Sequence, residues 1–243
     1  MSKVVIVTGG GRGIGAATAK LLAAKGYAVC VNYIANSARA DEVVDCINRA
    51  GGRAFAHQAD VSSETEVVRL FDATEAHFGN VTHLVNNAGV LFTQSKLVDI
   101  ELERFNHVLN SNVVSCFLCS REAVRRFTSG GAIVNVSSLA SQTGSPFEYV
   151  DYAASKGAMD TLTKGLSREV AAAGIRINAV RPGFIYTDMH ADGGEPGRVD
   201  RLAPQIPMQR GGTAEEVANT IAWLLSDEAS YVTGSFIDVA GGR

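Results

Sequence analysis

Short runs of apolar, β-branched residues alternate along this chain with segments of helical length, and polar residues do not interrupt the runs. Strands of that kind are buried on both faces, which is typical of a parallel sheet covered by helices on each side. The strands are expected at residues 4–8, 28–33, 53–59, 81–86, 132–137, 175–180 and 234–239. The helices are expected at residues 13–26, 37–51, 64–78, 100–127, 149–173 and 214–225. The sequence therefore predicts an α/β, doubly wound fold with seven strands and about six helices.

The length and composition fit one large, covered core. The chain has 243 residues, of which 46% are hydrophobic and 19% charged, and no break in composition divides it. Doubly wound sheets use about 200 to 250 residues as one domain, so a single domain over residues 1–243 is predicted. The one long irregular stretch, residues 187–212, is rich in glycine and proline. Loops of this length in compact domains are usually functional, and we interpret the segment as a substrate lid.

The charge balance limits the partners. Lys and Arg number 22 and Asp and Glu 25, so the formal charge of −3 gives no general attraction to phosphate polymers or anionic lipid. No apolar run approaches the roughly 18 residues of a membrane span. Met1-Ser2-Lys3 leads directly into the first strand, without the apolar core of a secretion signal. A cytoplasmic location is expected, with neither nucleic acid nor membrane as a partner.

The cysteines and histidines do not predict a metal site. The four cysteines are too few and too scattered for a disulfide framework, so reduced thiols are expected. Cys116 and Cys119 have metal-ligand spacing, but they lie in an apolar, helical run with no second ligand pair, and we interpret them as buried structural thiols. The five histidines show no spacing that suggests a metal centre.

A glycine-rich turn follows the first strand and leads into a helix. It contains Gly9, Gly13 and Gly15. Such glycines let the backbone turn sharply and let a pyrophosphate approach the helix N-terminus, whose free N–H groups favour an anion. A nucleoside triphosphate loop would need Lys and then Ser or Thr after the last glycine, where this chain has Ala16. The turn therefore predicts a dinucleotide site.

The residues after the second strand indicate which dinucleotide binds. Sites that prefer NAD usually place a carboxylate there to accept the ribose 2′-hydroxyl, whereas this chain has Asn32 and Tyr33. The first carboxylate of the chain is Asp41, and Arg12 in the turn can pair with a 2′-phosphate, with help from Arg39. NADP(H) is therefore the expected cofactor. Two alternatives stay open, namely that Arg12 only faces solvent and that NAD(H) is also used.

Tyr152 and Lys156 are four residues apart, so on a helix they share one face. Together with the glycine turn, the Asn-Asn-Ala-Gly run at 86–89 and the Ser-Ser pair at 137–138, this spacing makes the chain resemble the short-chain dehydrogenase/reductase family. The resemblance runs from residue 3 to residue 242. It implies a Rossmann-type NAD(P)-binding domain with seven strands in the order 3-2-1-4-5-6-7, and an assembly that is usually a homotetramer.

The resemblance also implies roles for four residues. Tyr152 would be the acid in carbonyl reduction and the base in the reverse direction. Lys156 would lower the phenol pKa from its usual value of about 10 and would hydrogen-bond the nicotinamide ribose. Ser138 would donate a hydrogen bond to the substrate oxygen, and Asn112 would hold the water that passes protons to Lys156. Ser137 is interpreted as structural.

The same resemblance implies the contacts with the cofactor, from the glycine turn to the start of the predicted lid. The expected contacts are Gly9, Arg12, Gly13, Ile14, Gly15, Asn32, Tyr33, Asp60, Val61, Asn87, Ala88, Gly89, Tyr152, Lys156, Pro182, Gly183, Ile185 and Thr187. Asn86 and Asn87 have an alternative interpretation, in which their side chains only tie neighbouring strands together.

The substrate is suggested by two departures from related sequences. Tyr152 lies 14 residues after Ser138, one more than is usual in the family, and the insertion at 146–151 should reshape the pocket wall. The chain resembles both 3-oxoacyl-[acyl-carrier-protein] reductases and glucose 1-dehydrogenase-type enzymes. Reductases that dock the acidic carrier protein present basic residues where this chain has residues 129–131 and 171–174, which carry none, although Arg125, Arg126 and Arg168 lie nearby in the sequence.

These departures favour a small carbonyl or alcohol substrate, a sugar among them, with the acyl carrier protein reductase as the alternative. A non-enzymatic NADP-sensing regulator on the same fold is a further alternative, but such proteins usually lose the tyrosine or the lysine, and both are present here. A sugar-nucleotide epimerase would need an added C-terminal substrate domain, which is not expected because the chain ends at Arg243.

Overall fold

The computed structural model describes residues 3–243, so the part of the N-terminal expectation that depends on Met1 and Ser2 lies outside the described residues. Its centre is one seven-stranded sheet in the order β3-β2-β1-β4-β5-β6-β7, with every neighbouring pair parallel. The strands are β1 (Val4–Val7), β2 (Ala28–Tyr33), β3 (Arg53–Gln58), β4 (His83–Asn86), β5 (Gly131–Val136), β6 (Ile175–Pro182) and β7 (Phe236–Val239). The predicted fold class and strand order are confirmed.

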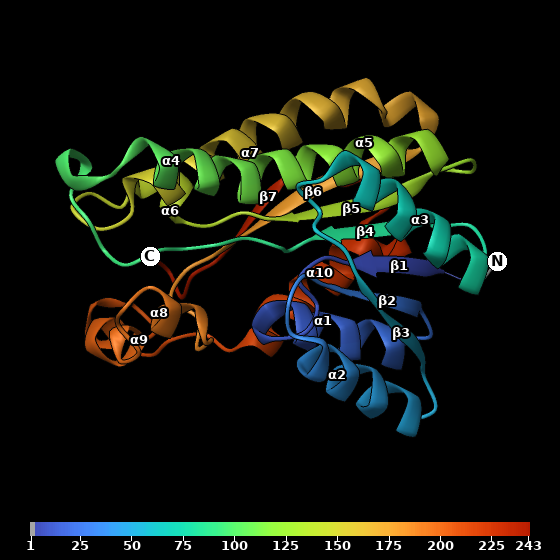
Figure 1. Ribbon diagram of the computed structural model, residues 1–243, viewed down its shortest axis with the longest axis horizontal. Coiled ribbons are helices and arrows are strands. Elements are labelled where there is room, and N and C mark those ends of the chain that lie inside the picture. Colours follow the sequence, from blue (N-terminus) through green and yellow to red (C-terminus); the bar gives the residue numbers. More distant parts are fainter. Residues whose placement is uncertain (1–2) are drawn as a thin grey trace.

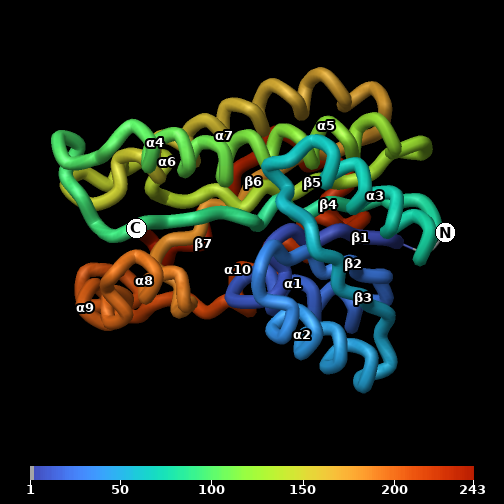
Figure 2. The backbone as a smooth tube through the Cα atoms, in the orientation of Figure 1, coloured from blue at the N-terminus to red at the C-terminus, as the bar shows by residue number. Residues whose placement is uncertain are grey.

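Helices cover both faces of this sheet (Figure 1). Those on one face are α1 (Gly13–Ala24), α2 (Ser37–Arg49) and α10 (Ala214–Leu225). Those on the other are α3 (Glu64–Phe78), α4 (Leu102–Leu109), α5 (Ser115–Arg126) and α7 (Val150–Glu169). Three short helices, α6 (Ala140–Thr143), α8 (Met189–Asp192) and α9 (Arg198–Leu202), lie toward the carboxyl ends of the strands, and the chain path in Figure 2 shows α8 and α9 folded together.

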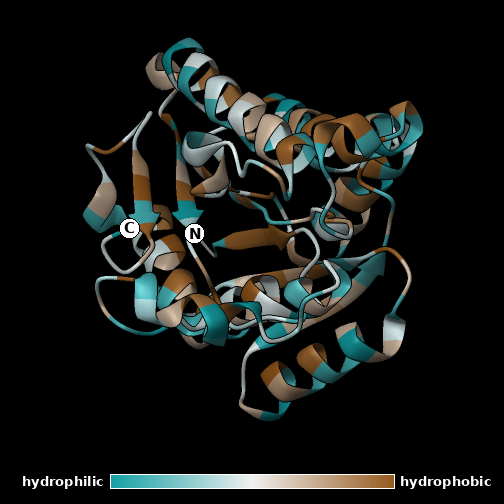
Figure 3. Cartoon of the chain, turned by 90° about the vertical axis from the view of Figure 1, so that its left-hand side faces the viewer, coloured by the Kyte–Doolittle hydropathy of each residue, from teal (hydrophilic) through white to brown (hydrophobic). Residues whose placement is uncertain are grey.

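Two apolar cores result from the alternation of side chains along the strands. Val5 and Val7 pack with α1, α2 and α10, whereas Val4 and Ile6 pack with α3 and α5. Figure 3 shows the central strands as predominantly hydrophobic. Because both faces of each central strand are covered, the unbroken apolar runs of the sequence are explained.

The helices differ from the prediction in two places. The long helix expected at 100–127 is α4 and α5 joined by a π-helical turn, η2 (Asn110–Val114). The helices α6, α8 and α9 have only four or five residues, which is too short for a periodic apolar pattern to reveal. The strands expected from residues 81 and 234 begin at His83 and Phe236.

The predicted state of the Cys116–Cys119 pair is confirmed, since both are buried, unpaired thiols on α5. Cys46 is also unpaired but lies exposed on α2. Within residues 3–243, none of the helices combines the length and the apolar character that crossing a bilayer requires.

Candidate active site and cofactor cavity

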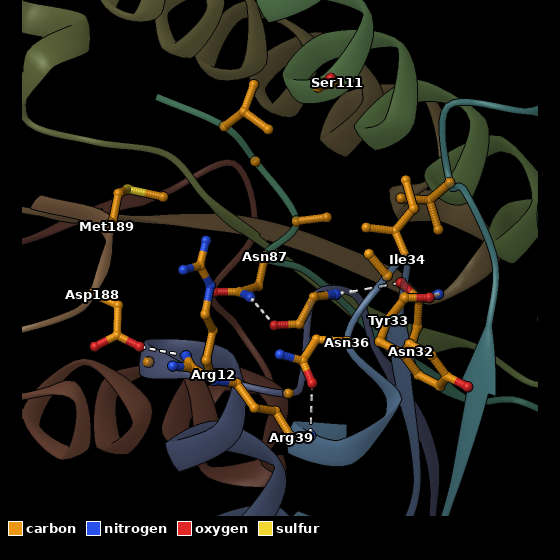
Figure 4. Close-up of a pocket in the computed structure, with 18 of the residues that line it drawn as sticks. Arg12, Asn32, Tyr33, Ile34, Asn36, Arg39, Asn87, Ser111, Asp188 and Met189 are labelled. Carbon is orange, nitrogen blue, oxygen red and sulfur yellow. Dashed lines mark hydrogen bonds and ion pairs between the residues drawn. The ribbon is translucent and has the colours of Figure 1, made fainter. Parts of the chain in front are cut away.

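A cavity of about 740 Å³ opens where β1, β2 and β4 end, and the segment from Thr187 to Asp192 forms its far wall. Figure 4 shows side chains from these elements pointing toward one another across it. The predicted cofactor residues that line it are Gly9, Arg12, Gly13, Ile14, Asn32, Tyr33, Asp60, Val61, Asn87, Ala88, Gly89 and Thr187. The carboxyl ends of parallel strands at a change in strand order are the usual ligand site of such sheets.

The sequence prediction did not include several other residues that line this cavity. They are Ile34, Asn36, Ser62, Ser111, Asp188, Met189 and Asp192. Their side chains carry no motif, and only the folding of 187–192 over the end of β2 brings the last three into place. No cluster of three or more His, Cys, Asp or Glu side chains suited to a metal ion occurs within residues 3–243.

The glycine-rich turn has the conformation that its sequence predicts. Gly9 and Gly13 have positive φ angles of 61° and 51°, a region that favours glycine. α1 begins at Gly13 with no acidic residue in its first turn, so its free N–H groups and dipole face the cavity uncompensated. Gly15 does not line the cavity. It is instead a packing position, because a Cβ there would lie 2.4 Å from the Gly9 carbonyl oxygen and 2.5 Å from Asn87 Nδ2.

Replacing Gly15 with alanine is therefore expected to lower the free energy of unfolding by about 1–3 kcal/mol, the usual effect of overpacking, and to weaken nucleotide binding by displacing the turn. The matched control is Gly165→Ala on the exposed face of α7, where an added Cβ meets nothing within 4 Å. The free energy of unfolding of that variant should rise by roughly 0.5–1 kcal/mol, because alanine is the better helix residue. Chemical denaturation of both variants measures the difference, and a Gly15→Ala protein as stable as the parent would contradict the packing role.

Asn32 does not present its side chain to a ribose as its position after β2 suggested. The side chain is buried, its Oδ1 accepts a hydrogen bond from Gly9 N at 3.3 Å, and its Nδ2 donates to the Ala59 carbonyl at 3.0 Å. Asn32 thus joins the glycine turn to the end of β3. Its amide is thus engaged by the fold, whereas the neighbouring Tyr33 is half-buried along the cavity.

The two arginines expected at a 2′-phosphate both reach the cavity and both form ion pairs across it. Arg12 Nη2 lies 2.6 Å from Asp192 Oδ2, and Arg39 Nη1 lies 2.5 Å from Asp188 Oδ2 (Figure 4 shows the second pair). Arg39 stands in the first turn of α2, beside Asn36, whose side chain accepts a hydrogen bond from the Arg39 backbone N–H. Arg12 therefore does not merely face solvent, as the alternative interpretation of this residue had it.

Ser138, Tyr152 and Lys156 come together where β5 ends against α7. The Ser138 hydroxyl lies close enough to the Tyr152 phenol to lower the pKa of that phenol, and it accepts a hydrogen bond from Ala140 N at 3.1 Å. Tyr152 and Lys156 share one face of α7, and Lys156 Nζ lies 5.5 Å from the centre of the Tyr152 ring. This group adjoins the cavity at Gly89, because a Cβ on Gly89 would lie 3.6 Å from Lys156 Nζ.

The expected lowering of the Tyr152 pKa by Lys156 is not found. Burial raises the pKa of Tyr152 to about 12, against the lowering effect of the Ser138 hydrogen bond. Lys156 Nζ donates to the Val136 carbonyl at 2.8 Å and contacts the Met159 sulfur, so its ammonium is directed into the fold. Burial lowers the pKa of Lys156 to about 8. Desolvation of both groups therefore outweighs their mutual attraction in this structure.

Asn112 lies between the loop after β4 and α7. It lies in the π-helical turn η2, fully buried, where Oδ1 accepts from Val90 N at 2.7 Å and Nδ2 donates to Ser155 Oγ at 3.0 Å. The side chain thus holds the loop after β4 against α7, and the role of Asn112 in holding a water stays a prediction. Such π turns are frequent at functional sites, and sequence periodicity gave no sign of this one.

The alternatives for the neighbouring polar residues are resolved by their contacts. Asn86 Nδ2 donates to Asn135 Oδ1 and Ser120 Oγ, which ties β4 to β5 and α5. Asn87 Nδ2 donates to the carbonyls of Thr8 and Gly9, so it supports the glycine turn as well as lining the cavity. Ser137 Oγ is buried and donates to the Lys156 carbonyl, which supports its structural interpretation.

Four cofactor contacts were predicted at the end of β6 and after it, and only one of these residues lines the cavity. Thr187 lines the cavity beside Gly13, whose Cβ would lie 3.4 Å from the threonine methyl. Pro182, Gly183 and Ile185 do not line it. Gly183 is instead a close-packing position, because a Cβ there would lie 2.9 Å from Ala240, and Ile185 is buried.

The inserted loop before α7 is fixed to the 187–212 segment by ion pairs that the sequence did not reveal. Arg198 of α9 is buried and donates to Glu148 Oε1 at 2.9 Å and to Glu195 Oε2 at 3.3 Å. The Tyr149 hydroxyl donates to the Gly193 carbonyl at 3.3 Å. The insertion at 146–151 therefore packs against the 187–212 segment, but none of its residues lines the cavity, so a reshaped pocket wall stays a prediction.

Arg104 and Asp151 form a second pair beside the catalytic helix. Arg104 Nε donates to Asp151 Oδ2 at 2.7 Å, and Arg104 Nη1 donates to the Thr93 carbonyl at 2.8 Å. Asp151 is buried and also accepts from the Tyr152 backbone N–H. The loop after β4 and the start of α7 are thereby held together next to the tyrosine.

Comparison with known proteins places this geometry among oxidoreductases. A family model described as enoyl-(acyl carrier protein) reductase matches residues 9–243. The uncharacterized oxidoreductase YgfF of Escherichia coli is 64% identical, with 99% of each chain covered. The 3-oxoacyl-[acyl-carrier-protein] reductase FabG of Staphylococcus aureus is 38% identical, covering 100% of this chain and 98% of its own.

Solved structures agree with the sequence comparisons. A short-chain dehydrogenase/reductase of Serratia marcescens carrying two phenylalanine-to-leucine substitutions superposes with a TM-score of 0.92 at 38% identity, over 99% of this chain and 97% of that one. A dehydrogenase/reductase from Sinorhizobium meliloti gives a TM-score of 0.93 at 34% identity, over 100% and 95%.

Proposed function

This chain belongs to the short-chain dehydrogenase/reductase family of oxidoreductases, and on that premise we propose that it transfers a hydride between NADP(H) and a carbonyl or secondary alcohol of a small substrate. The observation that carries the proposal is the group of Ser138, Tyr152 and Lys156 beside a cavity of about 740 Å³. The family implies an NAD(P) cofactor, and bound NADPH supplies the hydride.

The chain's own residues supply the proton and the orientation. With the pKa of Tyr152 raised to about 12, the phenol is protonated near neutral pH and can give its proton to a substrate oxygen. Ser138 donates to the same oxygen as negative charge develops on it. Gly89 lines the cavity and lies against Lys156 and Asn112, so we expect the substrate oxygen and the nicotinamide end of the cofactor to meet at this group.

NADP(H) is proposed over NAD(H) because of the charges at the other end of the cavity. Arg12 and Arg39 lie there beside the N-terminus of α2, and neither Asn32 nor Tyr33 supplies a carboxylate for a 2′-hydroxyl. A guanidinium pair of this kind favours a phosphate dianion. The same site leaves NAD(H) able to bind more weakly.

The substrate is proposed to be small, a sugar among the candidates, rather than an acyl carrier protein. Of the cations near the positions where a carrier protein would dock, Arg126 is already paired with Asp72, Glu75 and Glu122, and Arg125 lies 3.6 Å from Glu122. Paired arginines offer little net positive charge to an acidic partner. The acyl carrier protein reductase remains the second candidate because FabG of S. aureus is similar over the full chain.

Three further features belong to this proposal. The 187–212 segment would act as a lid within one domain. Val114 at the end of η2 and Phe117 on α5 are exposed apolar side chains that would be covered in the expected homotetramer. A cytoplasmic location would suit NADP(H) chemistry. A non-enzymatic NADP sensor is less favoured, because it has no need of the buried Tyr152–Lys156 group.

The test follows reduced nicotinamide by absorbance in two parallel reactions, NADPH with a 3-oxoacyl thioester and NADP⁺ with glucose, with NAD(H) controls. We expect turnover of the small alcohol and little activity on the thioester. A high kcat/KM on the thioester would establish the second candidate instead. Tight NADPH binding without turnover of either substrate, or of a panel of small ketones and aldehydes, would favour the sensor.

A further inference from the structure

Three carboxylates line the cofactor cavity, and two of them come from the 187–212 segment. Asp60 Oδ1 accepts hydrogen bonds from the Ser62 backbone N–H and hydroxyl, so these local bonds stabilise its charge. Asp188 and Asp192 instead reach across the opening and pair with Arg39 and Arg12. These are the same two arginines that the proposed function assigns to a 2′-phosphate.

A phosphate can replace the carboxylate in both ion pairs, because both pairs are partly exposed to solvent. The side chains of Arg12 and Asp192 are 46% and 45% exposed, and those of Arg39 and Asp188 are 47% and 55% exposed. Half-exposed ion pairs are weak because water and salt compete with them. A phosphate monoester carries up to two negative charges near neutral pH and three acceptor oxygens, so it can take both guanidinium groups from single carboxylates.

We propose that Asp188 and Asp192 compete with the 2′-phosphate of NADP(H) for Arg39 and Arg12, and thereby set how strongly the protein prefers NADP(H) over NAD(H). The inference rests on the proposed use of NADP(H). When NADP(H) binds, its phosphate must displace the two carboxylates, which then stand near a dianion. When NAD(H) binds, its 2′-hydroxyl leaves both pairs intact. The two aspartates therefore weaken the binding of NADP(H) alone.

A structural consequence follows for the 187–212 segment. In the NAD(H) complex its first turn, α8, stays tied to α1 and α2 through the two pairs, whereas NADP(H) releases it. The Arg198–Glu148 pair further along the segment does not involve the cavity arginines, so only the part near α8 is expected to respond. The identity of the nucleotide would thus alter the wall of the cofactor cavity that α8 forms.

The test is an equilibrium titration of the purified full chain with NADPH and with NADH, following nicotinamide fluorescence, for the parent, Asp188→Asn, Asp192→Asn and the double variant. Asparagine keeps the shape of the side chain and removes the charge. The double variant is expected to bind NADPH about fivefold more tightly or better, the lower end of typical coupling between sites, with the NADH affinity nearly unchanged. Raising the salt concentration should reduce the difference in NADPH affinity between the parent and the double variant.

Two controls separate this inference from the proposed cofactor preference. Asp227→Asn removes an exposed ion pair with Lys3 away from the cavity, so it should change neither affinity. Arg12→Ala and Arg39→Ala test the preference itself and should weaken NADPH binding more than NADH binding. Loss in the arginine variants without any gain in the aspartate variants would overturn the inference alone. No loss in the arginine variants would overturn the preference for NADP(H), and the inference with it.

Discussion

Replacing Tyr152 with phenylalanine is expected to lower kcat by about 10²–10⁴-fold, the usual contribution of a positioned acid or base. The substitution removes the only atom that the mechanism needs from this side chain, the phenolic oxygen, and keeps the ring against which Lys156 lies. Because Tyr152 does not line the 740 Å³ cavity, the NADPH dissociation constant should stay close to that of the parent. Steady-state rates and a nucleotide titration on the same preparation measure both quantities.

Tyr149→Phe is the matched control for this prediction. Tyr149 is a buried tyrosine three positions earlier whose hydroxyl donates to the Gly193 carbonyl, and position 153, where a lysine partner would stand, is alanine. Its substitution should cause a much smaller loss of kcat than Tyr152→Phe. Equal losses in the two variants, or full turnover by Tyr152→Phe, would contradict the assignment of the acid.

Lys156→Met is expected to abolish turnover and yet to stabilise the protein at pH 7. Burial lowers the pKa of Lys156 from 10.5 to about 8, so below pH 8 the fold must hold a desolvated ammonium. A shift of that size corresponds to roughly 3 kcal/mol, and loss of the hydrogen bond to the Val136 carbonyl offsets about 1 kcal/mol of the gain. We therefore expect the variant to be more stable by about 2 kcal/mol at pH 7, as measured by urea denaturation.

The lowered pKa of Lys156 also determines how the stability of the parent changes with pH. Between about pH 8 and 10.5 the native parent loses the Lys156 proton while the unfolded chain keeps it, so the parent gains stability as the pH rises. The advantage of Lys156→Met should therefore shrink across that window. Lys20→Met on the exposed side of α1 provides the control and should show no such window. A parent that is more stable than Lys156→Met at pH 7 would contradict this prediction, because the fold would then stabilise the buried Lys156 ammonium.

The fold was predictable because each of its signals is local in the sequence. Unbroken apolar runs such as Val4–Val7 identify buried parallel strands, and the glycines after them identify the turn at a phosphate. Most residues of the cofactor cavity could be found in the same way, since they stand directly after strands. The short helices and the π-helical turn η2 were not predictable, because one turn of helix leaves no periodic pattern.

The charges of the site were less predictable than their positions. Arg12 was expected to pair with a phosphate, but the carboxylate that it meets, Asp192, belongs to a segment far along the chain. The direction of Lys156 depends on the Val136 carbonyl at the end of β5, and that of Asn32 on Gly9 and β3. Side-chain direction and desolvation arise from packing between distant elements, which sequence spacing does not carry.

The proposed use of NADP(H) to reduce small carbonyl compounds is tested most directly by comparing kcat/KM for NADPH and NADH with one small ketone or aldehyde that the protein accepts. We expect consumption of NADPH with a kcat/KM at least about tenfold above that for NADH, which corresponds to roughly 1.4 kcal/mol from the two arginines. A preference for NADH would contradict the cofactor assignment. A complete lack of oxidation of either nucleotide across a panel of small carbonyls would contradict the reaction.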